Sequence, residues 1–506
     1  MRSELAEEYP LHWNILTDDF DAFSEVVTRL VEQHGDSPIG ASPAALHDGR
    51  RHPLNRKDKC GNTALHLCAI LQRPLRYAEL LLQHGANLPL RNVLGWTCMQ
   101  EAQASHNREL VKLFLRTANE RLETTFPATF EAGVERLRCA RDFAVDIEWQ
   151  FKSIVPFIGR FLPSDTCRVV KRGSRVRLDF SLRDFSMKTG WIRGPSSVLF
   201  DPQGCLPCSS AAGRKEETDF RHALVFVDHE KQIFRCAHKK PGADDAEAEL
   251  DNAVEVLVQS ELQHAGVYTG DVTLKPRTKF FSSTQQTAEV GGYMCKIFDL
   301  QGLCVFRQVR DAHLPDDLKK LNKEREEELK KSLQNEPDED KIAKIAKLQW
   351  SSVERYEFEP YAPPELDPVD YLLGRISPKS IMGEVKGHRK NVKSTLFLAR
   401  DFPLTYDDLM PVLDVGASAS RTLEKLQQYL SEVREHGFPV KLEMPLFMVL
   451  TATASFNNFR WLAKDERTAQ EFPDEFFRVP RDYEETHPAV QPTPSNEGGS
   501  VSQPRI

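Results

Sequence analysis

Apolar and polar positions follow two different periods along this chain. Up to about residue 118, apolar residues recur every three or four positions, which is the period of amphipathic helices. Residues 131–147 keep that period and predict one more helix. Strict alternation then follows, as in residues 175–180 (RVRLDF) and 223–228 (ALVFVD), and predicts strands with one buried face. The pattern therefore indicates a helical N-terminal part followed by an antiparallel sheet or sandwich decorated with helices.

Two further apolar segments belong to the predicted sheet. Residues 296–298 and 303–306 predict a hairpin with its turn at Gln301-Gly302. Residues 437–456 (GFPVKLEMPLFMVLTATASF) are strongly apolar, but the charges of Lys441 and Glu443 alternate with apolar residues and would be costly at the centre of a bilayer. We predict two strands there, or one bent strand, and not a membrane span.

The helical part contains a repeat. Residues 61–69 (GNTALHLCA) fit the ankyrin pattern G-x-T-P-L-H-x-A-A, with alanine in the proline position. A second unit begins 34 residues further on, at Gly95, and a degenerate earlier unit covers residues 9–35. Thr63 and His66 suit the turn-to-helix hydrogen bonds of such a repeat, so we favour a structural role for His66 over that of a metal ligand or base. Three repeats are near the lower limit for stability, and we expect contacts with the next domain to stabilise the array.

Shifts in composition divide the chain into domains. The predicted fold class is α+β, with an N-terminal ankyrin-repeat helical array (residues 1–118) followed by a β-rich, sandwich-like domain with helical insertions. This domain has a first part (residues 119–310) and a second part (residues 350–483). Between them, residues 311–349 predict a charged helical or disordered insert, because acidic and basic residues dominate and aromatic residues are absent. The proline- and glycine-containing residues 484–506 predict a disordered tail.

One segment interrupts the pattern of the array. Residues 35–58 are rich in glycine, proline, serine and arginine, which predicts a flexible insertion between the first two repeats. The cluster Arg50, Arg51 and His52 could bind an acidic partner, but we favour a solvated loop.

Composition and charge argue against several classes of function. The 506 residues carry a net charge of −8 with an isoelectric point near 6.1, which gives no general attraction to nucleic acid or anionic lipid. The N-terminus lacks the apolar segment of a signal peptide, and no uninterrupted apolar run of transmembrane length occurs. The ten cysteines follow no disulfide spacing. We therefore expect a cytosolic protein that reaches membranes only as a peripheral partner.

The sequence contains few motifs typical of catalysis, cofactor binding or metal binding. The chain has no phosphate-binding glycine loop, zinc-protease motif or serine nucleophile elbow, so neither enzyme activity nor a cofactor is expected. Cys205 and Cys208 have the spacing of zinc ligands, and Cys236 and His238 follow some thirty residues later. The second half is C-x-H, however, and the first pair lies in a Gly/Ser-rich loop. We favour incidental loop cysteines over a zinc site or a thiol redox pair, and no metal is expected.

The charged insert also contains half of a ubiquitin-interacting motif. Such a helix has an acidic run, a large apolar residue, an alanine three positions later and a serine four beyond that. Residues 326–328 and Leu329 supply the first half, but Ser332 stands in the alanine position and Glu336 in the serine position. Because alanine lets the helix approach its partner closely, we favour a solvated charged helix, and ubiquitin is not an expected partner.

Several segments together resemble a known family. They are residues 148–153 (EWQFKS), 155–165, 176–179 (VRLD), 438–442 (FPVKL), 451–453 and 477–483 (FRVPRDY). In combination with the repeats they are similar to the ankyrin repeat domain 13 family, whose C-terminal region is called the GPCR-chaperone domain. One branch of the family has ubiquitin-interacting motifs in a long tail and acts in endocytosis of ubiquitinated receptors. This chain resembles the other, C-type branch, because no such motif follows Tyr483.

The resemblance to the C-type branch implies a non-enzymatic chaperone for immature G-protein-coupled receptors. It implies peripheral association with the cytosolic face of the endoplasmic reticulum membrane, and control of receptor folding and exit. Without nucleotide chemistry, such a chaperone acts by binding the immature state in preference to the mature one. A ubiquitin-binding adaptor in endocytic trafficking and a generic ankyrin scaffold are the alternative functions.

No motif identifies the client-binding residues. The concave ankyrin face, or apolar positions of the β-rich domain, would contact cytosolic loops or tails of an unfinished receptor. Met444, Leu446, Phe447 and Met448 could be adaptable surface contacts. Because a strand there buries at least one face, we favour a role in the core for these four residues.

Overall fold

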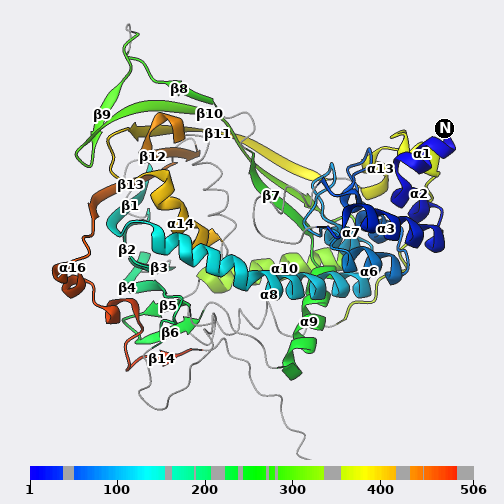
Figure 1. Cartoon of the computed structure of the whole chain (residues 1–506), viewed down its shortest axis with the longest axis horizontal. Coiled ribbons are helices and arrows are strands. Elements are labelled where there is room, and N and C mark those ends of the chain that lie inside the picture. Colours follow the sequence, from blue (N-terminus) through cyan, green and yellow to red (C-terminus); the bar gives the residue numbers. More distant parts are fainter. Residues whose placement is uncertain are drawn as a thin grey trace, which may run out of the picture.

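The computed structural model describes residues 1–37, 51–153, 162–186, 190–206, 223–236, 243–268, 273–279, 283–334, 355–383, 385–417, 434–447 and 450–486. In these ranges helices dominate the first part of the chain and a large sheet dominates the second, so the predicted α+β class is confirmed. Figure 1 shows the helical array on one side, the curved sheet on the other, and one long helix between them. No helix in the described ranges is long and apolar enough to cross a bilayer.

Stacked helix pairs form the array, as the repeat pattern predicts. The pairs are α2 with α3, α5 with α6, and α7 with α8, and they share one apolar core. The helices of this part are α1 (Arg2–Glu8), α2 (Pro10–Leu16), α3 (Phe20–His34), the 3-10 turn η1 (Pro53–Asn55), α5 (Ala64–Ile70), α6 (Leu75–Gln83), α7 (Cys98–Ala104) and α8 (Arg108–Cys139).

Helix α5 begins with a capping box that includes His66. The Nδ1 atom of His66 accepts a hydrogen bond from the Thr63 N–H group at 3.2 Å, so the ring proton lies on Nε2. That proton is donated to the carbonyl oxygen of Trp96 in the next repeat at 3.1 Å. The predicted structural role of His66 is therefore confirmed. Complete burial lowers the pKa of His66 to about 4, which keeps the ring neutral.

The fourteen strands of the described residues form one continuous, mixed sheet. Its order is β14-β6-β5-β4-β3-β2-β1-β13-β12-β11-β10-β7, with β8 and β9 also paired to β10, and only the β14–β6 pair is parallel. The first strands are β1 (Phe143–Ser153), β2 (Ser164–Arg172), β3 (Arg175–Ser186), β4 (Gly190–Phe200), β5 (Leu224–Asp228), β6 (Ile233–Cys236) and β7 (Leu262–Tyr268). The others are β8 (Thr273–Pro276), β9 (Thr287–Val290), β10 (Tyr293–Arg310), β11 (Lys386–Ala399), β12 (Phe438–Phe447), β13 (Leu450–Trp461) and β14 (Glu484–Glu485).

The two strands predicted within residues 437–456 are confirmed. They are β12 and β13, which pair in antiparallel fashion. Val440 is completely buried, whereas the neighbouring Lys441 and Glu443 form an ion pair of 2.6 Å on the other face of the strand. The alternation of apolar and charged residues therefore marks a half-buried strand, as the sequence predicts.

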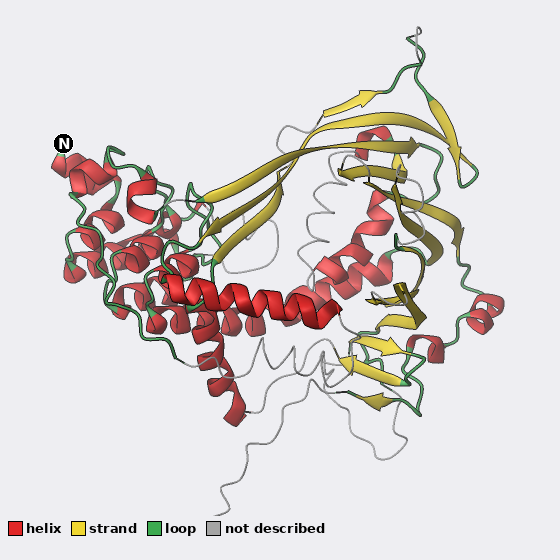
Figure 2. Ribbon diagram, turned by 180° about the vertical axis from the view of Figure 1, so that it is seen from behind, coloured by secondary structure: helices red, strands yellow, loops and turns green. Residues whose placement is uncertain are grey.

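The sheet curves around two helices that fill its concave side. Figure 2 shows α8 and α14 (Tyr406–Ala417) within this concavity. Leu137 of α8 and Leu409 of α14 join the same apolar cluster as Phe143 of β1, Leu300 of β10 and Leu396 of β11. Burial of a continuous apolar face against helices is the main force that holds such a layered structure together.

The helix predicted for residues 131–147 is wrong in its second half. Helix α8 ends at Cys139, and β1 begins at Phe143. In residues 143–147 the apolar residues Phe143, Val145 and Ile147 alternate with Ala144 and Asp146, and both periods fit so short a segment. Residues 143–147 form a strand because their backbone pairs with β2 on one side and with β13 on the other.

The hairpin predicted around Gln301 and Gly302 is also wrong. These residues lie inside the single 18-residue strand β10, where the pair stands opposite one residue, Lys393 of β11. This is a β-bulge, and Gly302 takes the positive φ of 87° that it requires. The chain therefore bends at this glycine and does not reverse.

The predicted flexible insertion, residues 35–58, is ordered at its described C-terminal end. His52 is buried and donates from Nε2 to the carbonyl oxygen of Gly35 at 3.0 Å, and Leu54 and Asn55 are almost completely buried. The prediction of a flexible loop is therefore wrong for His52, Leu54 and Asn55. Of the predicted basic cluster, Arg51 is exposed and His52 is buried. Arg50 lies outside the described residues.

The charged insert and the tail are described only in part. Residues of the predicted insert form helix α10 (Asp316–Gln334), while residues 335–349 lie outside the described ranges. The predicted tail begins with a strand, because Glu484 and Glu485 form β14 and pair with β6. Residues 487–506 lie outside the described ranges.

A segment from the second half of the chain crosses the ankyrin array. We call residues 355–373, which include α12 (Pro368–Leu372), the strap. The ring of Phe358 stacks on His106 with 3.7 Å between ring centroids, and the Tyr361 hydroxyl donates to the carbonyl of Ile70 at 3.3 Å. Tyr371 and Leu372 complete the apolar core of the array. Every residue of α5 is buried, between the neighbouring helices α2, α6 and α7 and the strap.

Buried polar side chains connect the array, the strap and the sheet in one network. Arg310 at the end of β10 donates to Glu101 of α7 at 2.8 Å, and Asn92 donates to the same carboxylate at 3.0 Å. Further hydrogen bonds lead through Asn62 to the hydroxyl of Tyr371 in the strap, which donates to Asp58 at 2.6 Å. We call this chain the seam network; its members, all less than a tenth exposed, are Asp58, Asn62, Asn92, Glu101, Arg310 and Tyr371.

The seam network predicts a large cost for breaking its ion pair. Glu101→Ala leaves the buried Arg310 cation without its carboxylate, and we expect a loss of about 3–5 kcal/mol in the free energy of unfolding. In the double variant Glu101→Leu/Arg310→Met, neither charge of the pair is left without its partner, and the loss should be much smaller. Urea unfolding of the full chain measures both. Equal losses in the two variants would show that the ion pair is not the critical contact.

Acid should weaken the array through His66. Its pKa is about 4 in the fold and 6.5 in its absence, so between these values the unfolded chain binds the extra proton. Stability is fully present above pH 6.5 and falls as the pH drops towards 4, with a loss of about 2 kcal/mol at pH 5 from this residue. Urea unfolding at pH 7.5 and pH 5 tests this, and His66→Gln should reduce the difference. An unchanged pH dependence in that variant would contradict the assignment.

Candidate functional site

Three family-like segments meet at one cleft on the sheet. Residues 148–150 of β1, 164–166 of β2 and 179–181 of β3 line a cleft of about 650 Å³, together with Arg168, Arg193 and Pro195. The segments belong to three consecutive strands, and antiparallel pairing of β1 with β2 brings Trp149 opposite Asp165. The resemblance includes residues 148–150, 164, 165 and 179 of this lining, whereas Thr166, Phe180 and Ser181 lie just outside the segments that carry it.

The cleft is organised around the carboxylate of Asp165. Its oxygens accept hydrogen bonds from the N–H groups of Thr166, Ser181 and Leu182 at 2.7–2.9 Å and from the Ser181 hydroxyl at 2.7 Å. Burial alone would raise the pKa of Asp165, but the hydrogen bonds to the hydroxyl and the three N–H groups outweigh it and hold the pKa below its usual value. The three N–H groups and the Ser181 hydroxyl thus hold the Asp165 carboxylate in place and stabilise its ionised form.

The rim of the cleft combines aromatic rings with cations. Trp149 and Phe180 are half-buried, and Arg193 is about half exposed. Arg193 donates to the Ser181 hydroxyl at 2.8 Å and lies 3.6 Å from Asp165, so its position is set by the cleft. An aromatic surface beside a positioned guanidinium suits an extended peptide with an apolar anchor and a carboxylate or carbonyl group.

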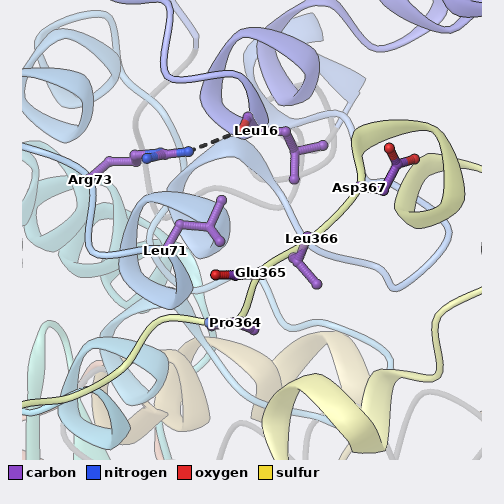
Figure 3. A pocket seen from close by; sticks show the side chains of 7 residues that line it. All are labelled: Leu16, Leu71, Arg73, Pro364, Glu365, Leu366 and Asp367. Carbon is purple, nitrogen blue, oxygen red and sulfur yellow. Dashed lines mark hydrogen bonds between the residues drawn. The ribbon is translucent and has the colours of Figure 1, made fainter.

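A second cleft lies between the array and the strap. Its volume is about 490 Å³, and Figure 3 shows Arg73 and Leu71 facing the strap residues Leu366 and Asp367. Arg73 donates to the carbonyls of Ile15 and Leu16 at the end of α2 and pairs with Asp18 at 3.1 Å. This cation therefore satisfies a helix C-terminus. The strap also covers α5, so a client cannot bind this part of the array as the sequence suggested unless the strap leaves.

One serine, histidine and aspartate cluster resembles a hydrolytic triad in composition only. The Ser197 hydroxyl donates to Asp179, and its oxygen lies 2.7 Å from Nε2 of His229. The other ring nitrogen of His229 bonds to the Tyr483 hydroxyl at 3.0 Å and not to a carboxylate. The serine proton is thus held by the acid, and Ser197 is only 1% exposed. The cluster fastens Tyr483 of the closing segment to the sheet.

The cysteines of the zinc hypothesis are partly outside the described residues. Cys208 and His238 are not described, and Cys236 is half-buried. Cys205 is completely buried in an apolar cluster with Val225, and burial raises the pKa of its thiol. The described residues contain no group of side chains that could hold a metal ion. Cys205 lies in a loop between β4 and β5, as predicted, and its side chain is part of the core.

The structure describes only some of the residues considered as client contacts or as a ubiquitin-interacting motif. Met444 packs against the sheet core, in agreement with the favoured role. The side chains of Leu446 and Phe447, and the whole of Met448, lie outside the described structure. The half motif at residues 326–329 falls within helix α10, where Glu327 is exposed, but the side chains of Leu329 and Ser332 are not described.

Comparison with known proteins gives a consistent result. A family model described as ANKRD13 C-terminal matches residues 177–484, and a model of the ankyrin repeat matches residues 60–93. Ankyrin repeat domain-containing protein 13C-A of Xenopus laevis is 28% identical over 441 residues, which cover 86% of this chain and 79% of that protein. The 13C protein of Homo sapiens is 27% identical over 86% of this chain and 74% of its own length. The 13B protein of Homo sapiens is 28% identical over 80% of this chain and 63% of its own length.

The hydrogen bonds of Asp165 predict its effect on stability. Asp165→Asn places an NH2 group among N–H donors and removes charge-assisted bonds, and we expect a loss of about 2 kcal/mol in the free energy of unfolding. Glu148→Gln, at an exposed carboxylate that lines the same cleft, should leave stability unchanged. Thermal unfolding of the two variants measures the difference, and equal stability would show that the Asp165 charge does not organise the cleft.

Proposed function

Because this chain belongs to the ankyrin repeat domain 13 family, we propose that it is a non-enzymatic chaperone for immature G-protein-coupled receptors. It acts at the cytosolic face of the endoplasmic reticulum membrane, to which it is bound peripherally. There it regulates receptor biogenesis and exit by binding cytosolic loops or tails of the unfinished receptor.

The length of the similarity supports the C-type branch. The matches with the 13C proteins of Homo sapiens and Xenopus laevis cover 86% of this chain, and the match with the human 13B protein covers 80%. The single observation that carries the proposal is this similarity to 13C proteins along 86% of the chain, through both the array and the sheet. The described residues add no catalytic constellation that would favour an enzyme.

The cleft on β1–β3 is the surface we assign to the client. Its rim offers Trp149 and Phe180 as aromatic contacts and Arg193 as a positioned cation. A receptor loop that is extended before its helices pack can enter such a cleft, and the same loop in a finished receptor is held away from it. Preferential binding of this kind stabilises the immature state by mass action and needs no nucleotide.

Capture of receptors from crosslinked cells tests the proposal. With the native chain we expect co-purified receptors that carry immature, high-mannose glycans. Arg193→Glu should reduce their capture about tenfold, because it replaces a positioned cation by an anion, and a tenfold change corresponds to about 1.4 kcal/mol. The matched control Arg138→Glu, at an exposed arginine of α8, should capture as much as the native chain.

The other outcomes separate the competing functions. Receptors with mature glycans and attached ubiquitin would assign the chain to endocytic trafficking. Capture of no receptor would leave a generic ankyrin scaffold. Equal capture by Arg193→Glu and Arg138→Glu would move the client surface away from the cleft.

A further inference from the structure

Strand β11 has a long edge that no described strand covers. On one side, residues 386–398 pair with β10 almost throughout. On the other side, β12 pairs only with residues 395–399. Nine residues, 386–394, therefore have no described strand on this side over about 30 Å, and the last of them, Ser394, is buried. Figures 1 and 2 show this part of the β10–β11 pair, with β7 on the other side of β10, extending towards the array.

This open edge is strongly basic in an acidic protein. Its sequence is KGHRKNVKS, with four lysines or arginines, one histidine and no acid, whereas the chain as a whole has a net charge of −8. The side chains of His388, Arg389, Lys390 and Lys393 are all exposed. Acids also lie close by: Asp311 pairs with Lys386 at 2.8 Å, and Glu261 lies 3.8 Å from Arg307 of β10, the residue opposite His388. Positive charge therefore predominates along the edge.

The cations lie on both faces of the sheet. Successive side chains of a strand point to opposite faces, and the register of β10 with residues 386–392 is regular. Lys386, His388 and Lys390 therefore share one face, while Arg389 and Lys393 share the other. A flat bilayer surface would meet only one of these sets. An added strand, in contrast, has neighbours on both faces, and its side chains form cross-strand pairs with all of them.

The edge also offers backbone groups that only another backbone satisfies fully. Alternate residues of an edge strand direct N–H and C=O groups outward, as a row of both donors and acceptors. Phosphate groups of lipids or nucleic acids accept hydrogen bonds but cannot donate to the carbonyls. A peptide strand supplies both kinds of group and, when acidic, also neutralises the cations.

We propose that residues 386–394 of β11 bind an acidic, extended segment of a partner protein as an additional strand. Because His388, Arg389 and Lys390 are consecutive, the segment needs consecutive acids at its centre and not acids at every second position. Residues of high β propensity on both sides of the acids would favour pairing. This inference does not depend on the proposed chaperone function, since it concerns a different part of the sheet and a purified system.

A synthetic peptide tests the proposal with the full chain. The probe is a fluorescent nonapeptide with three central glutamates flanked by threonine and valine, and its binding is followed by fluorescence anisotropy. We expect saturable binding, and hydrogen exchange should slow at the amides of residues 386–394. The variant Arg389→Glu/Lys393→Glu should weaken binding about tenfold. The matched control Lys320→Glu/Lys323→Glu, on exposed positions of α10, should bind as the native chain does.

Two altered probes separate strand pairing from simple charge attraction. The same peptide with alternate backbone nitrogens methylated keeps its charge but loses its donors, and it should bind at least tenfold more weakly. Equal binding of the methylated peptide would overturn the proposal, because charge alone would then account for the binding. Absence of peptide binding would also overturn the proposal. The lysines of β11 would then be explained as residues that prevent edge-to-edge aggregation. Binding of phosphatidylserine vesicles but not of the peptide would instead identify a lipid surface.

Discussion

The buried ion pair between Glu101 and Arg310 constrains the rest of this structure. A buried charge pair is stabilised by further hydrogen bonds, and here Asn92 supplies one of them to Glu101, while the buried Nε of Arg310 has no partner among the described residues. Because Glu101 belongs to the array and Arg310 to the end of β10, neither part can be displaced without exposing a charge in an apolar interior. The seam network extends the same condition to the strap through Tyr371. The array, strap and sheet therefore form one body.

This arrangement changes where the protein can bind others. Ankyrin arrays usually offer an extended concave surface to partners, but here the strap packs on α5, and its rings occupy positions beside His106 and Ile70. A short array gains apolar burial from the strap that further repeats would otherwise provide. The surfaces left for partners lie on the sheet, where strand pairing fixes the positions of Trp149 and Asp165 before any partner arrives. Such preorganisation reduces the entropy lost on binding.

The sequence predicts the local structure well where one period dominates. The repeat at residues 61–69, the role of His66 and the strands within residues 437–456 are confirmed because their patterns agree with their surroundings. The hairpin prediction around Gly302 is wrong, because a glycine between two alternating segments suits a hairpin turn and a bulge equally. Only the pairing of β10 with β11 distinguishes the two.

Long-range contacts account for the other parts that the sequence does not reveal. Residues 355–367 have no helical or strand assignment, and their order comes from contacts with the array. The same holds for His52 and Leu54 in a segment whose composition suggests flexibility. Resemblance marked part of the cleft lining, namely residues 148–150, 164, 165 and 179, but only the pairing of β1, β2 and β3 shows that these residues meet. The charge at β11 is visible in the sequence, whereas its open edge follows only from the shorter partner β12.

The cleft and the basic edge have a fixed spacing because they belong to one sheet. From β11 the order runs through β12, β13 and β1 to β2, which is four steps of about 4.8 Å and a lateral separation of about 20 Å. A partner segment that occupies one site is then held near the other at a high effective concentration, provided that its linker spans this distance. Two individually weak contacts on a rigid support can thus discriminate an extended, unfinished chain from a folded one. A folded partner cannot present both segments at the required separation unless its own structure matches that of the sheet.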